Sequence, residues 1–222
     1  MKIIEFILEL FYPRRAECMG CGSRIGMDSR DVCPECRMRL TKSWVGVRMP
    51  DRDMKISNAA YAYRYASPAG GMVRKLKYSG VQLLADEMGR DTACAAELMR
   101  VKDALVTFVP MHPRRERRRG FNHSELLARK AAAQLGFECM NLLARTRNAP
   151  QQARLSREER LVNLKDAFCV PEDVRPLAAG RNILLIDDVF TTGATAKSCA
   201  EALLDAGAAK VYFAAYAYGE GS

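Results

Sequence analysis

The stretch that decides the fold reads Ile183-Leu-Leu-Ile-Asp-Asp-Val-Phe-Thr-Thr-Gly-Ala-Thr195. Its first four residues are all aliphatic, and a short apolar run of this kind is typical of a strand that is buried on both faces. Asp187 and Asp188 end the run, and a short loop then leads to a helix that we expect to begin at about Thr195. A strand, a loop and a helix in this order predict one unit of a parallel α/β sheet.

The loop in this stretch has the features of a phosphate site. In an open parallel sheet, ligands bind beyond the carboxyl ends of the strands. Backbone N–H groups, hydroxyls and the helix N-terminus suit an anion, and Gly193 lets the backbone approach it closely. The two acids cannot bind phosphate but can accept hydrogen bonds from adjacent sugar hydroxyls, so we predict a ribose 5-phosphate site. Two turn acids before a helix cap are the alternative. The predicted phosphate-binding residues are Thr191, Thr192, Gly193, Ala194 and Thr195.

The string from Asp187 to Thr195, with the apolar residues ahead of it, resembles the signature of the type I phosphoribosyltransferases. The resemblance implies a parallel sheet flanked by helices and a site for 5-phosphoribosyl 1-pyrophosphate. It also implies that Asp187 and Asp188 are catalytic residues that hold the ribose, and that Mg2+ accompanies the pyrophosphate. In such enzymes a nucleophile, often a base nitrogen, attacks C1 of the ribose.

Strands and helices alternate along most of the chain. Tyrosines at every second position predict a strand over about 56–65, and Ser67-Pro68 is typical of the start of a helix. Apolar spacing predicts a second helix over about 81–100. Beyond it we expect strands at 104–109, 141–144, 167–170, 182–186 and 210–218, and helices at 124–135 and 195–206. This alternation predicts a parallel sheet covered on both faces.

Basic residues gather between two of the expected elements. Residues 112–130 hold seven Lys or Arg against two Glu, and five of the arginines fall within six residues. By strand order, this is where the enzymes that the chain resembles place their pyrophosphate loop, and cations there would stabilise the departing pyrophosphate. Arg119 and Gly120 are therefore substrate-binding candidates, with a solvated basic turn or a nucleic-acid patch as alternatives. His112 and His123 are candidates for a general base or for polar loop residues.

Residues 145–165 form a polar segment that is too long for a tight connection between strands. Such a segment usually marks a binding loop or a lid. It resembles the mobile loop that closes over the pyrophosphate donor in phosphoribosyltransferases, where closure excludes water from a reactive cation. The resemblance names Arg157 and Arg160 as catalytic candidates that contact phosphate. An amphipathic helix over 155–165 is the alternative.

Four of the eight cysteines are spaced as a metal-binding module. They follow the pattern C-x2-C-x11-C-x2-C, and the other four stand alone among apolar or small neighbours, which is typical of buried thiols. Two such knuckles bring four thiolates within reach of one ion and leave no position for water, which predicts a structural Zn2+. Two disulfides or free thiols are the alternatives. The predicted ligands are Cys18, Cys21, Cys33 and Cys36.

The whole pattern resembles one narrower family, the ComF proteins of bacterial natural competence. The match rests on the cysteine module, Leu76-Lys77-Tyr78, Arg119-Gly120-Phe121-Asn122, Gln151 to Asn163 and Asp187 to Thr195. Most members have Gln after Arg-Gly-Phe-Asn, where this chain has His123. We expect an N-terminal helix and zinc module over 1–45, a hood-like connecting segment over 46–100 and a phosphoribosyltransferase-like domain over 101–222.

The ComF resemblance implies a part in DNA uptake and leaves two functions open. The first is an enzyme that transfers a phosphoribosyl group to an acceptor that the sequence does not name. The second is a non-catalytic module that keeps a nucleotide-like pocket and binds single-stranded DNA and competence or helicase proteins. Clustered arginines would bind the DNA backbone. The tyrosines that would stack on bases, or belong to the core, are Tyr61, Tyr63, Tyr65 and Tyr78.

Composition bounds these interpretations. The 222 residues are 49% hydrophobic and 27% charged, which excludes a disordered chain. The net charge of +9 favours anionic partners. No apolar run reaches the roughly 20 residues of a membrane span, and Glu5 and Glu9 interrupt residues 1–13, which predicts an amphipathic helix and not a signal peptide. We therefore expect a cytoplasmic protein with reduced cysteines.

Overall fold

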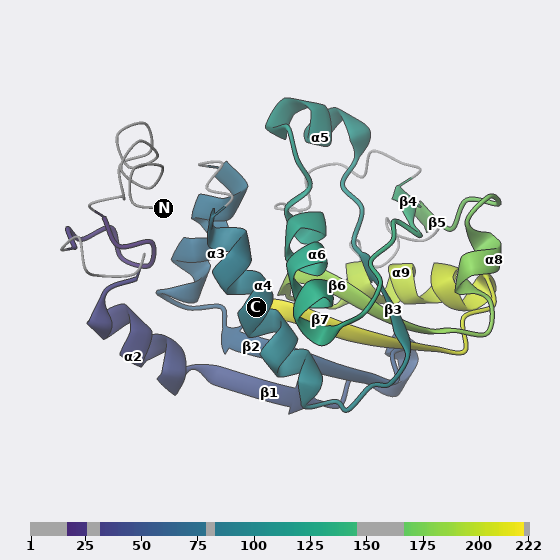
Figure 1. The fold of residues 1–222 in the computed structure, drawn as a ribbon, viewed down its shortest axis with the longest axis horizontal. Coiled ribbons are helices and arrows are strands. Elements are labelled where there is room, and N and C mark those ends of the chain that lie inside the picture. The colour runs from purple at the N-terminus through teal and green to yellow at the C-terminus, as the bar shows by residue number, and fades with distance from the viewer. Residues whose placement is uncertain (1–16, 26–31, 79–82, 146–166, 220–222) are drawn as a thin grey trace, which may run out of the picture.

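The computed structural model describes residues 17–25, 32–78, 83–145 and 167–219, and its centre is a five-stranded sheet (Figure 1). The strands are β1 Trp44–Arg48, β2 Asn58–Arg64, β3 Ala104–Phe108, β6 Asn182–Phe190 and β7 Lys210–Tyr218. They lie side by side in the order β1-β2-β7-β6-β3. The pairs β2–β7, β7–β6 and β6–β3 are parallel, and the edge strand β1 is antiparallel to β2.

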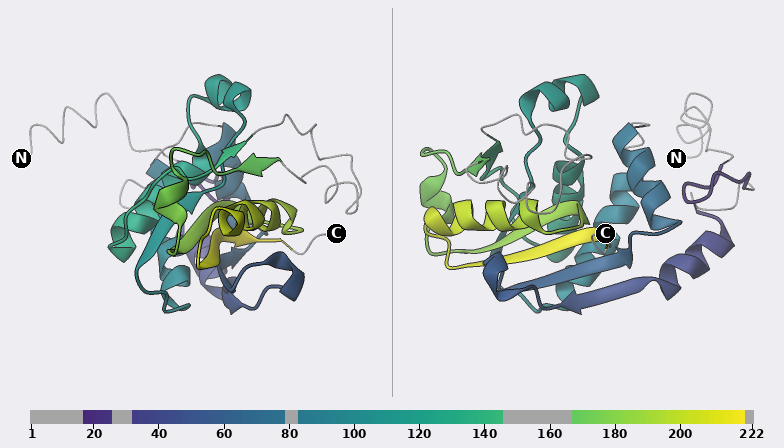
Figure 2. Two further views of the ribbon diagram at one scale, coloured as in Figure 1. Left: turned by 90° about the vertical axis from the view of Figure 1, so that its right-hand side faces the viewer. Right: turned by 180° about the vertical axis from the view of Figure 1, so that it is seen from behind.

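Helices cover both faces of this sheet (Figures 1 and 2). One face carries α3 Ala69–Tyr78, α4 Leu83–Glu97 and α6 His123–Leu135. The other face carries α9 Ala194–Asp205, the short helix α8 Arg175–Ala178 and a small antiparallel sheet of β4 Ala144–Arg145 and β5 Phe168–Cys169. The remaining described elements are α2 Pro34–Lys42, the 3-10 turn η1 Arg52–Met54 and α5 Pro113–Arg119.

Two separate hydrophobic cores follow from the period-2 alternation of the strands. On β6, Leu184 and Ile186 are buried against the α4 and α6 side, while Ile183 and Leu185 are buried against the α9 side. A strand that is covered on both faces needs apolar residues at every position, which is what residues 183–186 provide. The structure confirms the predicted fold class, a mainly parallel α/β sheet flanked by helices and preceded by a four-cysteine cluster.

The strand that carries the acids is longer than the sequence predicts. β6 continues to Phe190 because Asp187, Val189 and Phe190 keep backbone partners on β7. The prediction that the two acids end the strand is therefore wrong. Asp187 and Asp188 lie within its last four residues, so the strand backbone itself orients their carboxylates.

Other differences from the predicted elements have local causes. Of the strand predicted at 141–144, only Ala144 lies in a strand, β4, which stands outside the main sheet and pairs with β5. The expected basic loop contains the helix α5, because Pro113 begins it and His112 Nδ1 accepts the N–H of Arg114 at 3.1 Å. Neither β1 nor α2 was predicted. The helix predicted over 1–13 and most of the polar segment at 145–165 lie outside the described residues.

Candidate functional site

A cavity of about 460 Å3 opens beside the last residues of β6. One side of it comes from a single stretch, Asp187–Thr195, which we call the continuous wall. The other side comes from segments far apart in the sequence, and we call it the composite wall. The residues of the composite wall are Tyr65, Lys77, Tyr78, Arg115, Arg119 and Arg145. The two acids of the continuous wall therefore lie opposite four basic side chains and two tyrosines of the composite wall.

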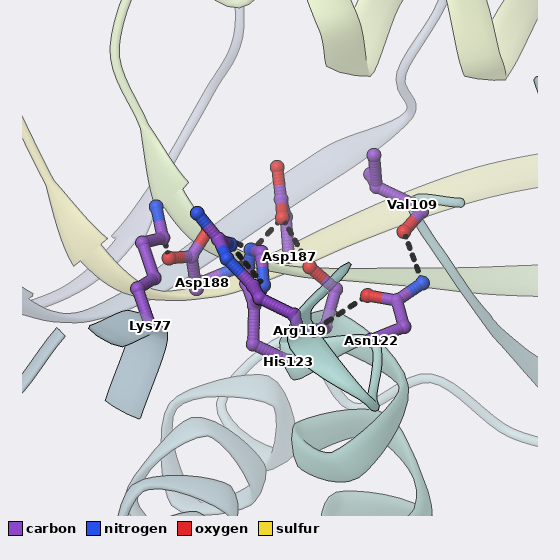
Figure 3. A network of polar contacts seen from close by, with 8 residues as sticks. Lys77, Val109, Arg119, Asn122, His123, Asp187 and Asp188 are labelled. Atoms are coloured by element: carbon purple, nitrogen blue, oxygen red, sulfur yellow. Dashed lines mark hydrogen bonds and ion pairs between the residues drawn. The ribbon is translucent and has the colours of Figure 1, made fainter. Parts of the chain in front are cut away.

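Asp188 is buried and held by two basic side chains (Figure 3). Lys77 Nζ lies 2.5 Å from Asp188 Oδ2, and His123 Nε2 lies 3.5 Å from Oδ1. Burial acts to raise the pKa of Asp188, but the Lys77 ammonium and His123 outweigh it and hold that pKa well below its usual range. Asp188 is therefore a carboxylate that stays charged at neutral pH, with a basic partner at each of its two oxygens.

Asp187 is a carboxylate of a different kind, although it is the next residue. Its Oδ1 accepts hydrogen bonds from Ser124 Oγ at 2.7 Å and from the backbone N–H of Asp188 at 2.8 Å. Burial and the neighbouring charge of Asp188 raise the pKa of Asp187 to about 7. Asp187 is thus an acid of the cavity lining that titrates near neutral pH.

The continuous wall ends in a loop that leads to α9. Thr191 and Thr195 line the main cavity, and a smaller hollow of about 30 Å3 lies along Thr191–Thr195. Gly193 has a φ of 76° and stands immediately before the helix. A Cβ at this position would meet Met54 Cε and lie 2.8 Å from Phe190 Cζ, so any larger residue would strain the backbone and displace these side chains. All five residues predicted to bind phosphate therefore lie together around this hollow.

The turn between α5 and α6 sets the opposite rim of the cavity. Asn122 caps α6 by accepting the Ser124 N–H at 3.0 Å and donates to the Val109 carbonyl at 3.2 Å. Arg119 lines the cavity, with Nη1 3.3 Å from His123 Nδ1. Gly120 is not among the lining residues and instead ends α5, with a φ of 84°. Of the two candidates predicted in this segment, the structure brings only Arg119 to the site.

Three cavity cations were not among the predicted site residues. Lys77 projects from α3, Arg115 from α5 and Arg145 from β4. Burial and the nearby Arg115 lower the pKa of Arg145, and its Nε is buried without a hydrogen-bond partner among the described residues. Each of them lies in a stretch that the sequence marks: Lys77 in Leu76-Lys77-Tyr78, Arg115 in the basic residues 112–130, and Arg145 at the start of the polar segment 145–165. The predicted catalytic residues Arg157 and Arg160 lie outside the described residues.

The four cysteines of the N-terminal module form a second candidate site. Their sulfur atoms all lie within 4.8 Å of one another, and Cys21 Sγ is 3.9 Å from Cys33 Sγ. Four sulfurs that bind one zinc ion at 2.3 Å lie about 3.8 Å apart, whereas a disulfide needs about 2.05 Å. Each cysteine in the described part of the chain is free. The cluster therefore has the donor set and spacing that suit zinc, and the disulfide alternative does not fit it.

The cysteine module rests on α3, the helix that also supplies Lys77. Lys75 Nζ donates to the Cys18 carbonyl at 2.8 Å. A Cβ on Gly71 would lie 2.5 Å from the Gly20 carbonyl oxygen, so the two backbones are in direct contact. Gly71 and Lys75 thus attach α3 to the module. The last two residues of the helix, Lys77 and Tyr78, line the cavity.

The fold and its two sites define a class of protein: an α/β protein with a cysteine module, an acid pair at the end of β6 and a hydroxyl-rich loop that follows this strand. No family model matches the chain. The chain is 31% identical over 205 residues to DNA utilization protein YhgH of Escherichia coli K12, covering 87% of this chain and 86% of that protein. It is 27% identical over 216 residues to Competence protein ComFC of Bacillus subtilis, covering 91% and 83%. The chain belongs to the ComF family.

Solved structures give a more distant likeness. A glutamine phosphoribosylpyrophosphate amidotransferase from B. subtilis matches with a TM-score of 0.41 and 21% identity. The match covers 58% of this chain and 25% of that one, so the chain spans about a quarter of the length of that structure. Each helix in the described part of this chain is too short or too polar to cross a membrane.

Proposed function

We propose that the protein binds 5-phosphoribosyl 1-pyrophosphate in the cavity beside β6 and acts in DNA uptake. The observation that carries the proposal is the continuous wall, which brings two carboxylates and the hydroxyls of Thr191 and Thr195 to one cavity. The names of the relatives, which refer to DNA utilization and competence, support the role in DNA uptake. The signature that Asp187–Thr195 resembles supports the choice of ligand.

Each part of the proposed ligand has a chemically matched partner in the cavity. The 5-phosphate suits the hollow of Thr191–Thr195, where backbone N–H groups at the start of α9 would donate to it. Ribose hydroxyls would donate to the two carboxylates, of which Asp187 has the freer oxygen. The pyrophosphate would bind the arginines of the composite wall, and Arg157 and Arg160 stay proposed as further phosphate contacts.

A Mg2+ ion would enter with the pyrophosphate and neutralise charge on the leaving oxygens. His123, Asp187 and Asp188 offer ligand atoms within 4.8 Å of one another. Because Lys77 already neutralises Asp188, we propose Asp187 as the main protein contact of the ion. These residues suit a Mg2+ ion that enters bound to the pyrophosphate more than an ion that only protein side chains coordinate.

A non-catalytic module remains the second candidate, and one observation favours it. Arg114, Arg117 and Arg118 are exposed on α5 and do not line the cavity. Figure 1 shows α5 standing above the rest of the fold. A projecting run of cations suits the backbone of single-stranded DNA, and competence or helicase proteins are the other proposed partners.

The proposed function is tested by calorimetry with 5-phosphoribosyl 1-pyrophosphate and Mg2+. The double variant Asp187→Asn/Asp188→Asn keeps the size of both side chains but removes charge-assisted hydrogen bonds worth about 1.5–3 kcal/mol each. Affinity should fall at least about tenfold. The matched control Asp173→Asn/Asp205→Asn removes two exposed acids outside the cavity and should bind like the wild type. Equal affinity in both variants would refute the site.

A measurement of pyrophosphate release then distinguishes the enzyme hypothesis from the hypothesis of a non-catalytic module. The purified protein is incubated with the donor, Mg2+ and a panel of bases, nucleotides and oligonucleotides as acceptors. Release that depends on one acceptor and is lost in the double variant supports a phosphoribosyltransferase. Donor binding without release across the panel supports the module.

We also propose that the cysteine cluster holds one structural zinc ion per chain. Four thiolates fill a tetrahedral shell, so the ion would have no open position for chemistry. Burial and the neighbouring cysteines raise the pKa of Cys36, and a bound cation would favour the thiolate form of this side chain. Metal analysis of freshly purified, reduced protein should find one zinc per chain, and its absence would reject the assignment.

A further inference from the structure

Two consecutive residues at the start of α6 each contact one acid of the pair. Ser124 Oγ donates to Asp187 Oδ1 at 2.7 Å, and His123 Nε2 lies 3.5 Å from Asp188 Oδ1. Asn122, the residue before them, is buried and caps the helix. The backbone that carries His123 is therefore fixed relative to β6, and the place of its imidazole ring follows from the fold.

The second ring nitrogen of His123 contacts Arg119 (Figure 3). Its Nδ1 lies 3.3 Å from Arg119 Nη1. A guanidinium group can only donate hydrogen bonds, so Nδ1 must be the acceptor. A neutral imidazole that accepts at Nδ1 carries its proton on Nε2, the nitrogen that faces Asp188. One tautomer therefore satisfies both contacts, and the ring is only 12% exposed, so water has little access to either nitrogen.

Arg119 is held on a second side by Tyr78, whose ring centre lies 5.0 Å from the guanidinium carbon. Arg115, one turn earlier on α5, also lines the cavity. Its side chain has no hydrogen bond or ion pair within the described part of the chain. Of the two cavity arginines on α5, Arg119 is thus the one that other described side chains hold in place.

We propose that His123 is a positioning residue: as the Nε2–H tautomer, it holds the guanidinium of Arg119 in the cavity, where the pyrophosphate of the ligand would bind. The identity of this anion rests on the proposed function, whereas the contacts that hold Arg119 are present without a ligand. A side chain that is fixed in advance does not lose its rotamer freedom at binding, so the anion binds more tightly.

The proposal sets a chemical requirement at position 123, namely one acceptor for Arg119 and one donor toward Asp188. Gln meets this requirement, because its amide has both a carbonyl oxygen and an NH2 group, whereas Leu has neither. His123→Gln should therefore keep Arg119 in place, and His123→Leu should release it. If the imidazole only filled space, the Gln and Leu variants would not differ in this way.

Calorimetry on the full chain, with Mg2+ present, compares 5-phosphoribosyl 1-pyrophosphate with ribose 5-phosphate, which lacks the pyrophosphate. His123→Leu should bind the first ligand about three- to tenfold more weakly, the cost of ordering one long side chain. Its affinity for ribose 5-phosphate should stay that of the wild type, and His123→Gln should bind both ligands like the wild type. Equal losses for both ligands, or equal affinities in the Leu and Gln variants, would overturn the proposal.

A double-mutant cycle tests whether His123 acts through Arg119. In the Arg119→Met background, His123→Leu should cause no further loss of donor affinity, because the side chain that His123 positions is gone. Arg115→Met is the matched background, since Arg115 lies on the same helix and lines the same cavity. There His123→Leu should cause the same loss as in the wild type. Losses at positions 119 and 123 that simply add would contradict the positioning role.

Nitrogen NMR tests the tautomer without any ligand, and it also decides the case in which His123→Leu does not fold. The chain has two histidines, and His112→Asn leaves only the signals of His123 while keeping a good helix cap. The Nδ1 signal should be that of an unprotonated nitrogen, and it should shift in Arg119→Met but not in Arg115→Met.

The NMR outcomes separate this inference from the proposed function. A proton on Nδ1, or an Nδ1 signal that does not respond to Arg119→Met, overturns the positioning role even where 5-phosphoribosyl 1-pyrophosphate binds. The expected signals in a protein that binds neither ligand support the positioning role and count against the proposed function.

Discussion

The two walls of the cavity are built in opposite ways. The continuous wall, Asp187–Thr195, is one strand end and one loop, so its geometry depends mainly on local backbone. The composite wall gathers six side chains from β2 to β4, and its geometry depends on how helices pack on the sheet. The continuous wall can therefore stay the same while the side chains of the composite wall change. This is a physical reason why proteins that share the signature can bind different ligands.

The largest expected effect comes from the cysteine module, because it supports only the composite wall. Cys18→Ser or Cys36→Ser should abolish zinc binding, and a short module without its metal loses most of its folding energy. Since α3 rests on the module, hydrogen exchange within 69–78 should speed up at least about tenfold, while exchange in 183–190 stays slow. Cys94→Ser, at an exposed solitary thiol, is the matched control. Equal exchange in all variants would mean that α3 holds its place without the module.

Gly193→Ala tests the continuous wall. The substitution combines a positive φ with a clash against Met54 and Phe190, so urea denaturation should show a loss of about 2–5 kcal/mol. Gly136→Ala is the control, because Gly136 has a similar φ of 71° and nothing within 4 Å of its added Cβ. It should cost about 1–2 kcal/mol. Similar losses in both would show that the loop adjusts and that the close packing at Gly193 is not required.

The difference between the walls also explains what the sequence could predict. Residues 183–195 follow one another in the chain, so the apolar pattern, the turn residues and the family resemblance can all be read from one stretch. The residues predicted there to bind phosphate do lie together in the structure. Lys77 and Arg145 reach the site only through tertiary packing, which no local pattern reports. The helix α5 depends on a histidine cap, an uncommon capping residue. Tyr65 differs from Tyr63 only in lying one residue beyond β2, a boundary that sequence patterns place poorly.

Lys77→Met tests the ion pair that joins the two walls. Removal of the ammonium leaves Asp188 buried with His123 alone, and the variant should lose about 3 kcal/mol at pH 7. Because the folded-state pKa of Asp188 is lowered, the pair stabilises the fold above the unfolded value near 3.9, and this contribution is lost as the pH falls through the folded value. The difference between wild type and variant should therefore shrink below about pH 4.

An exposed pair provides the control for this ion pair. Lys130 Nζ also lies 2.5 Å from a carboxylate, that of Asp86, but both side chains are about half exposed. Lys130→Met should cost less than about 1 kcal/mol and show little dependence on pH. A loss at Lys77 that is no larger than the loss at Lys130, in urea denaturation at pH 7, would contradict the assigned role of the buried pair.

The smallest effect on the fold is expected from the arginines of α5 that belong to neither wall. Arg115 and Arg119 line the cavity, so the three arginines left for a longer polyanion are Arg114, Arg117 and Arg118. Their replacement by Ala should leave stability and donor affinity unchanged. If they bind single-stranded DNA, the slope of log affinity against log salt should become shallower by about two units, since each neutralised phosphate contributes about 0.7.

The control for the α5 variant removes the same number of positive charges from other parts of the surface. Arg39, Arg52 and Arg90 are exposed and lie outside α5 and the cavity. Their replacement by Ala lowers the charge by the same three units, so long-range attraction weakens equally in both triple variants. A slope that changes only for the α5 variant assigns the contacts to this helix. Equal slopes in the two triple variants would mean that the effect comes from net charge alone. If no oligonucleotide binds even at low salt, the DNA role of α5 is refuted and a protein partner is the remaining proposal for this helix.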